Sequence, residues 1–190
     1  MLKLAVVSLL GLFAGINTSY SQSVLEVAAE VDRLIDQQTQ PSSNKICSDE
    51  VYLRRLFLDI TGKTPTLDDI LVFNLETHPE KRTKVAEVLL QDPDYGANWA
   101  RFWRDVIYYR RSNDQILLGA SIAEDYFQDT LNTNTPWDQF ATDLITALGD
   151  IRQDGRTALI AAQQGRPEET VSEISRIFLG IQIQCAQCHD

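Results

Sequence analysis

Cysteine, histidine and methionine are scarce in this chain. Its 190 residues include three Cys, two His and one Met. The sequence has no Ser-His-Asp set, phosphate-binding loop or glycine fingerprint. No block of Lys or Arg offsets its formal net charge of −10. We therefore expect no enzymatic activity within this chain, and the acidic balance argues against binding to nucleic acid or anionic membranes.

Long hydrophobic runs are also absent, apart from one near the N-terminus. Lys3 precedes an almost entirely apolar stretch over residues 4–16, and small residues follow at Ser19 and Ser21. This pattern predicts a signal peptide over residues 1–21, cleaved after Ser21. The alternative, a membrane anchor, is disfavoured because such a helix reaches about 20 Å, short of the roughly 30 Å hydrocarbon core. We expect an exported, periplasmic or cell-surface protein with no membrane span after cleavage.

Strand-like alternation is missing too, except at residues 181–183, a segment too short to use. Apolar residues recur at three- and four-residue spacing, which predicts an all-α fold with a single domain of about seven helices and the Cys motif at its C-terminal end. An N-terminal helix and a polar linker occupy residues 22–44. The predicted helices of the main domain, residues 45–190, cover residues 48–62, 66–75, 79–90, 97–109, 122–131 and 136–148, and a last one opens at Pro167 and leads into the motif.

Local signals refine these boundaries. Ser48 is an expected N-cap, Gly62 an expected helix stop, and Thr66 with Asp69 forms a capping box. We expect a turn at residues 92–96, a loop at 110–119 and weak structure at 150–165. Helix faces expected to point inward include Val51, Leu53, Leu56, Phe57 and Ile60 in one helix and Trp137, Phe140, Ala141, Leu144 and Leu148 in another.

The final six residues carry the most specific chemistry. Cys185, Cys188 and His189 form C-x-x-C-H, the attachment pattern for haem c. Two thiols three positions apart lie on one face of a helical turn, where each can bond one vinyl group of a porphyrin. His189 follows as the expected metal ligand to the iron. Export favours this reading, because covalent haem attachment takes place outside the cytoplasmic membrane.

A second axial ligand is hard to find. The single Met is Met1, and the one other His is His78, more simply read as a solvated side chain. Either His78 reaches the iron, the ligand comes from beyond Asp190, or the iron is five-coordinate. Aromatic residues at helical spacing could line a porphyrin, although core packing is the simpler reading; they are Trp99, Phe102 and Trp103. Several arginines could pair with haem propionates or, more simply, with nearby carboxylates; they are Arg54, Arg55, Arg101 and Arg104.

Two other readings of the motif stay open. Cys47 together with Cys185, Cys188 and His189 makes a Cys₃His set suited to structural zinc, although Cys47 has no close partner in the sequence. The pair Cys185–Cys188 could instead form a structural or redox disulfide. In either case the chain would be a helical interaction module rather than an electron carrier. If the pair binds haem, Cys47 is the one free thiol and is expected to be a buried small hydrophobe.

Four ordered stretches resemble a known family, the planctomycete-specific cytochrome-like domain of exported proteins of unknown function. They are residues 49–66, 94–103, 134–140 and 178–190. The resemblance implies a haem-bearing electron-transfer segment with a redox partner that the sequence does not identify. In the family a further His-Pro pair and a second planctomycete-specific domain follow the motif. The resemblance therefore implies that the domain over residues 45–190 is incomplete at its C-terminus.

Overall fold

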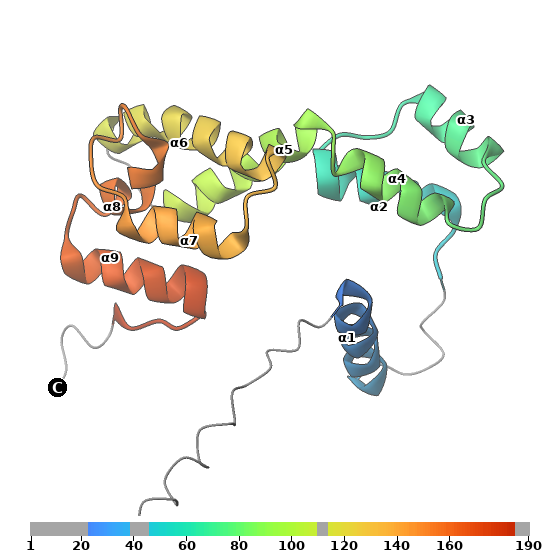
Figure 1. Ribbon diagram of the computed structural model, residues 1–190, viewed down its shortest axis with the longest axis horizontal. Coiled ribbons are helices and arrows are strands. Elements are labelled where there is room, and N and C mark those ends of the chain that lie inside the picture. Colours follow the sequence, from blue (N-terminus) through green and yellow to red (C-terminus); the bar gives the residue numbers. More distant parts are fainter. Residues whose placement is uncertain (1–22, 39–45, 110–113, 185–190) are drawn as a thin grey trace, which may run out of the picture. The chain divides into compact units, whose positions relative to one another are not determined.

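The computed structural model describes residues 23–38, 46–109 and 114–184, and every element in these ranges is helical (Figure 1). The chain divides into two compact units, Met1–Ile46 and Cys47–Asp190. The all-α expectation is confirmed. Within the described ranges, no helix combines the length and the hydropathy needed to cross a bilayer.

The first unit contains α1 (Val24–Gln38). Its start is fixed by a reciprocal pair, because the backbone N–H of Ser23 donates to the Glu26 carboxylate and the N–H of Glu26 donates to the Ser23 hydroxyl. Leu25 is 81% exposed, whereas Val27, Val31, Leu34 and Ile35, which share one face by three- and four-residue spacing, are about half exposed. The helix is therefore amphipathic, as the sequence predicts.

The second unit begins with three short helices, α2 (Asp49–Thr61), α3 (Leu67–Leu75) and α4 (Lys81–Leu89). Two of the predicted signals hold here, whereas Ser48 occupies the N-cap position of α2 without a side-chain capping hydrogen bond. Gly62 adopts a left-handed conformation with φ 70° and its N–H donates to the Leu58 carbonyl. Thr66 and Asp69 form the capping box, with both hydrogen bonds present.

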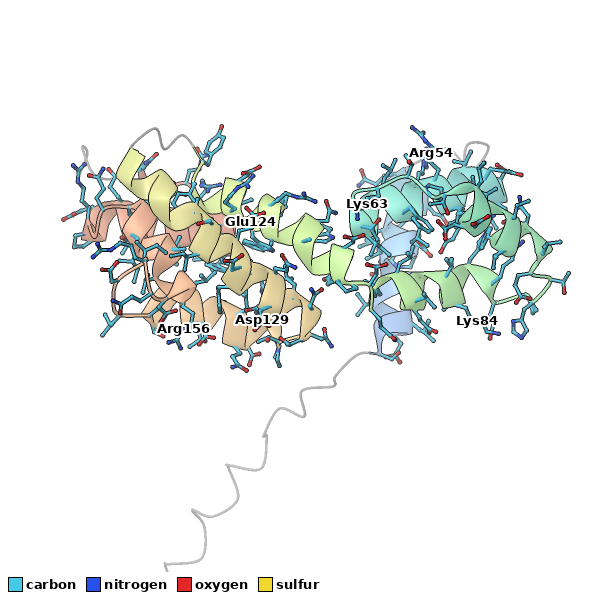
Figure 2. The ribbon with its side chains drawn as sticks, turned by 90° about the horizontal axis from the view of Figure 1, so that it is seen from above. Arg54, Lys63, Lys84, Glu124, Asp129 and Arg156 are labelled. Atoms are coloured by element: carbon cyan, nitrogen blue, oxygen red, sulfur yellow. The ribbon has the colours of Figure 1, made fainter. Side chains whose placement is uncertain are left out.

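Helices α5 (Pro93–Ile107) and α6 (Asp114–Asn132) pack against each other in antiparallel fashion. The register follows from two contacts. Near the start of α5 the Gly96 N–H donates to the Asn132 side chain at the end of α6, at 2.9 Å, whereas nearer its end Arg104 pairs with Glu124 of α6 at 2.6 Å (Figure 2). A Cβ on Gly96 would lie 2.4 Å from the Asn132 side-chain oxygen, so glycine is required for this approach.

The remaining elements close the core over α5 and α6. They are α7 (Trp137–Thr146), the 3₁₀ turn η2 (Gly155–Thr157), α8 (Ala158–Ala162), α9 (Pro167–Ile174) and the π-helical turn η3 (Ser175–Leu179). The core they complete is fully buried, and aromatic rings fill its centre beside small residues that allow close helix approach. It comprises Ala100, Ile107, Tyr108, Ala123, Phe127, Phe140, Leu144, Ala158, Leu159 and Ala162.

The helix count differs from the expectation, with nine α-helices in the described residues rather than about seven. The difference comes from α1, which the sequence places before the main domain, and from α8, which it did not predict. Helix α8 has five residues, too short for a clear period. Yet Ala158, Leu159 and Ala162 are entirely buried, so tertiary packing rather than local pattern determines this segment.

Two expected irregular segments are wrong because they contain helix starts. Residues 93–96 are the first turn of α5 and not a turn between helices, since Asp92 caps the Asp94 N–H and Pro93 occupies the first helical position. Likewise α6 begins at Asp114, inside the expected loop over residues 110–119. The last helix also stops short of the motif: α9 and η3 end at Gly180, which is left-handed with φ 67°.

Three expected inward positions are also wrong. Val51 is 42% exposed, Trp137 is 56% exposed and Leu148 is 90% exposed. Leu148 lies beyond the end of α7 at Thr146, so the helical period no longer directs it toward the core. Trp137 lies in the first turn of α7, where its ring lies beside those of Trp103 and Phe140 while more than half of the side chain is exposed to solvent.

Candidate functional site

The predicted haem-binding residues Cys185, Cys188 and His189 lie outside the described residues. What the structure does show is the approach to them. In η3 the Arg176 guanidinium donates to the Val106 carbonyl of α5 at 2.9 Å and to the Glu173 carboxylate at 2.7 Å. The N–H groups of Gly180 and Ile181 both donate to the Ser175 carbonyl, which ends the helix. The chain is therefore anchored and turned five residues before Cys185.

The aromatic residues considered as a porphyrin wall divide into two groups. Trp103 is partly buried and packs its ring on Trp137 and Phe140, with ring centroids 5.3 and 5.2 Å apart. It therefore belongs to the edge of the core, which was the simpler reading. Phe102 is 52% exposed and leans on Trp99 and Trp103, so it covers the rim of the same cluster.

The arginines considered as propionate partners divide in the same way. Arg104 is held by Asp105 at 2.8 Å and by Glu124 at 2.6 Å, which also keep the pKa of its guanidinium raised. Its ion pair with Glu124 links α5 to α6. Arg54, Arg55 and Arg101 are exposed, and Arg54 points outward from α2 (Figure 2).

His78 has a local structural task. Its ring Nδ1 atom accepts a hydrogen bond from the Glu80 backbone N–H at 3.2 Å, and the backbone N–H of His78 donates to the Glu76 carboxylate at 2.8 Å. That second bond, with the Thr77 N–H, lowers the pKa of Glu76. His78 thus organises the exposed turn before α4. Cys47 is a partly buried free thiol, and within the described ranges no group of Cys, His, Asp or Glu is arranged to hold a metal ion.

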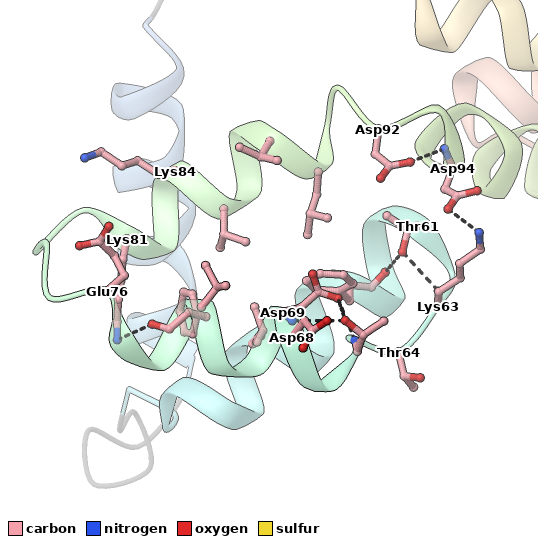
Figure 3. Close-up of a pocket in the computed structure, with 18 residues that line it drawn as sticks. Thr61, Lys63, Thr64, Asp68, Asp69, Glu76, Lys81, Lys84, Asp92 and Asp94 are labelled. Carbon is pink, nitrogen blue, oxygen red and sulfur yellow. Dashed lines mark hydrogen bonds and ion pairs between the residues drawn. The ribbon is translucent and has the colours of Figure 1, made fainter.

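A cleft that the sequence did not indicate lies between α3 and α4, with α2 beneath it (Figure 3). Its volume is about 670 Å³, within the range that small-molecule and peptide anchor sites occupy. The floor and lips are apolar and are formed by Leu53, Phe57, Val72, Phe73, Val85, Val88 and Leu89. On the lips Val72 and Val88 are 70% and 67% exposed.

Charged residues border this cleft, and most of them already have partners. Asp69 accepts from Thr66, Asp92 accepts from the Asp94 N–H, and Asp94 pairs with Lys63. Lys81 pairs with Asp49 at 2.6 Å, donates to the Phe73 carbonyl and lies 4.6 Å from the centre of the Phe73 ring. These contacts fix the positions of the charged side chains at the edge of the cleft.

Ion pairs with Asp49 explain how α4 can begin with two positively charged residues. Lys81 and Arg82 open α4 with two positive charges, which the helix dipole disfavours at that end. The Asp49 carboxylate offsets these charges by forming ion pairs with Lys81 at 2.6 Å and with Arg82 at 2.7 Å. The hydrogen bond from Lys81, followed by that from Arg82, lowers the pKa of Asp49. Arg82 also stacks on the Tyr52 ring, whose hydroxyl donates to the Arg82 carbonyl at 2.8 Å.

Among the comparisons with known proteins, only the comparison with family models gives a match. The model of the family PSCyt2, described as a protein of unknown function (DUF1549), matches residues 30–190. No curated protein and no solved structure matches the chain. The family match begins inside α1 and runs through the C-x-x-C-H residues.

Proposed function

The chain belongs to the PSCyt2 family of proteins of unknown function (DUF1549), and on that premise we propose that it binds haem c covalently and serves in one-electron transfer. Cys185 and Cys188 are the proposed attachment points and His189 the proposed axial ligand. The observation that carries the proposal is the C-x-x-C-H spacing itself, at the end of an anchored helical domain. Export through the N-terminal signal peptide belongs to the same proposal, because attachment requires that compartment.

The donor set fits a haem group by its chemistry. Each thiol adds across one vinyl double bond, so that a carbon–sulfur bond forms and the thiol proton moves to the neighbouring carbon. No external oxidant is needed for that step. His189 supplies an imidazole nitrogen immediately after the second thiol. A bound haem provides reversible one-electron exchange at its iron, and the protein's part is to fix His189 and exclude water around it.

The described helices support the proposal as a scaffold. Arg176 ties η3 to α5, and Gly180 then turns the chain before the motif. The Nδ1 atom of His78 accepts a local hydrogen bond at the start of α4, which supports a structural role for His78 rather than a role as second axial ligand. We therefore propose that His189 is the one axial ligand that this chain supplies.

The decisive experiment is production of the full chain with a cytochrome maturation system. The proposal predicts a Soret band that survives acid–acetone extraction, and a haem adduct in the mass of the mature protein. Replacing both Cys185 and Cys188 with Ala should abolish the adduct, whereas His189→Ala should keep the adduct possible but change the spin state. A colourless product with a Cys185–Cys188 disulfide, or with bound zinc alone, would end the proposal in favour of an interaction module.

A glycine pair tests whether the turn positions the motif. Gly165 and Gly180 have φ values of 65° and 67°, and a Cβ at either would meet nothing within 4 Å. Alanine at either position should therefore cost about 1 kcal/mol of stability through backbone strain alone. Only Gly180→Ala should also lower the yield of covalent haem. Equal yields from the two variants would show that the Gly180 turn does not position Cys185.

A further inference from the structure

The cleft between α3 and α4 is a second candidate site, separate from the proposed haem attachment. Helix α3 buries only one of its large side chains, Phe73, which is 5% exposed. On the same helix Leu67, Leu71, Val72 and Leu75 are 59–79% exposed. Of these exposed residues Val72 lines the cleft, as does Val88 of α4, which is 67% exposed. The cleft therefore has an uncovered apolar surface of the kind that partners bind.

The charge around the cleft is uneven. Its lining contains the five carboxylates of Asp68, Asp69, Glu76, Asp92 and Asp94, but only the three ammonium groups of Lys63, Lys81 and Lys84. Figure 3 shows four of the carboxylates toward one end of the cleft, where Lys63 is the one accompanying cation, and Glu76, Lys81 and Lys84 toward the other end. The first end thus has four carboxylates and one ammonium group. The first end is therefore acidic.

We propose that this cleft binds an amphipathic helix of a partner protein, with an apolar stripe in the cleft and basic residues at the acidic end. The shape favours a helix, because α3 and α4 each have nine residues and span about 13 Å, close to two and a half helical turns. Anchors at positions i, i+3, i+4 and i+7 fit a groove of that length. The acidic end is complementary to the positive N-terminal end of such a helix and to basic side chains in its first turns.

The probes are two synthetic 14-residue helical peptides with the same leucine stripe. One carries Lys and Arg in its first two turns, and the other carries Glu at those positions. Titrated into the full chain and followed by calorimetry, the basic peptide should bind about tenfold or more tightly than the acidic one, and its affinity should fall with salt. Absence of binding, or equal binding of the two peptides, would overturn the proposal.

General attraction of a basic peptide to an acidic protein is excluded by a matched pair of variants. Val72 and Leu71 are neighbours on α3 and are both mostly exposed, yet Val72 lines the cleft and Leu71 does not. Val72→Glu and Leu71→Glu change the net charge equally. Val72→Glu should weaken binding of the basic peptide by about tenfold or more, whereas Leu71→Glu should leave it within about twofold.

Both variants should keep wild-type circular dichroism and melting temperature, since neither side chain is in the core. If Leu71→Glu weakens binding as much as Val72→Glu, the peptide binds the outer leucines of α3 or the surface in general, and the cleft is not its site. Because neither peptide needs haem, the result is independent of the proposed electron-transfer function.

Discussion

The core formed by α5 to α8 consists of buried residues, whereas the smaller core formed by α2, α3 and α4 borders a cleft; we call these the closed region and the open region. In the first region Phe127, Leu144 and Leu159 are wholly buried among small residues that bring the helices together. In the second region the buried apolar side chains are few, namely Leu53, Ile60, Phe73 and Leu89, and three of these line a cleft.

Polar contacts replace part of the missing packing in the second region. Asp49 joins α2 to the two cations at the start of α4, and Tyr52 bonds and stacks with Arg82. Such contacts hold helices in position without covering apolar surface, because they need only a few atoms at one end of the helices. We infer that the closed region contributes most of the stability of the fold, whereas the open region has the surface that we propose for binding.

The largest expected effect tests this comparison directly, by removing one Phe side chain from each core. Phe127→Ala should lower the free energy of unfolding by about 4 kcal/mol, because it leaves a cavity among fully buried neighbours. Phe73→Ala should cost clearly less, about 2 kcal/mol, since Phe73 borders an open cleft that water can enter. Urea denaturation measures both. Equal losses would show that the α3–α4 core is as tightly packed as the other.

A smaller effect is expected from Asp49→Asn, which tests the polar contacts of the open region. Lys81 and Arg82 lower the pKa of Asp49 from its ordinary value of 3.8, so the carboxylate stabilises the folded state above that pH. This contribution is lost as the pH falls through the lowered pKa. The melting temperature of the variant should therefore lie below wild type at pH 7 and converge with it in acid. A difference that persists in acid would mean that the charge is not responsible.

The smallest effects are expected from two tyrosines of the closed region. Burial raises the pKa of Tyr108 to about 12, and its hydroxyl has no hydrogen-bond partner within the described residues. Because the ordinary pKa is 10.0, stability from the neutral form is complete below pH 10 and is lost as the pH rises toward 12. Tyr108→Phe should therefore raise the free energy of unfolding by up to about 1 kcal/mol and reduce the alkaline loss.

Tyr126 is the matched control for that change. Burial also raises its pKa to about 12, but its hydroxyl is bonded to Asp143 at 3.3 Å. Tyr126→Phe removes this hydrogen bond and should therefore destabilise the protein slightly, with the opposite sign to Tyr108→Phe. If both substitutions destabilise, the Tyr108 hydroxyl has a partner in solution, and the closed core is better satisfied than its described contacts indicate.

Local chemistry made several elements predictable from the sequence. The Thr66–Asp69 capping box, the Gly62 stop and the Pro167 start depend on side chains within four residues of one another, and all three are where the pattern places them. The Asp92-Pro93 pair is ambiguous in the sequence, because the same two residues favour both a turn and a helix start. The packing of α5 on α6, with Asn132 fitted against Gly96, is what shows that this one is a helix start.

The helical class, the Thr66–Asp69 capping box and the C-x-x-C-H spacing can all be read from the chain, because periodicity, caps and spacing are properties of neighbouring residues. The packed helices were needed to show that Ala158, Leu159 and Ala162 are core, that Arg104 and His78 make structural contacts, and that a cleft lies between α3 and α4. The physical reason is that burial and pairing depend on residues distant in the chain, and no local pattern contains the other half of such a contact.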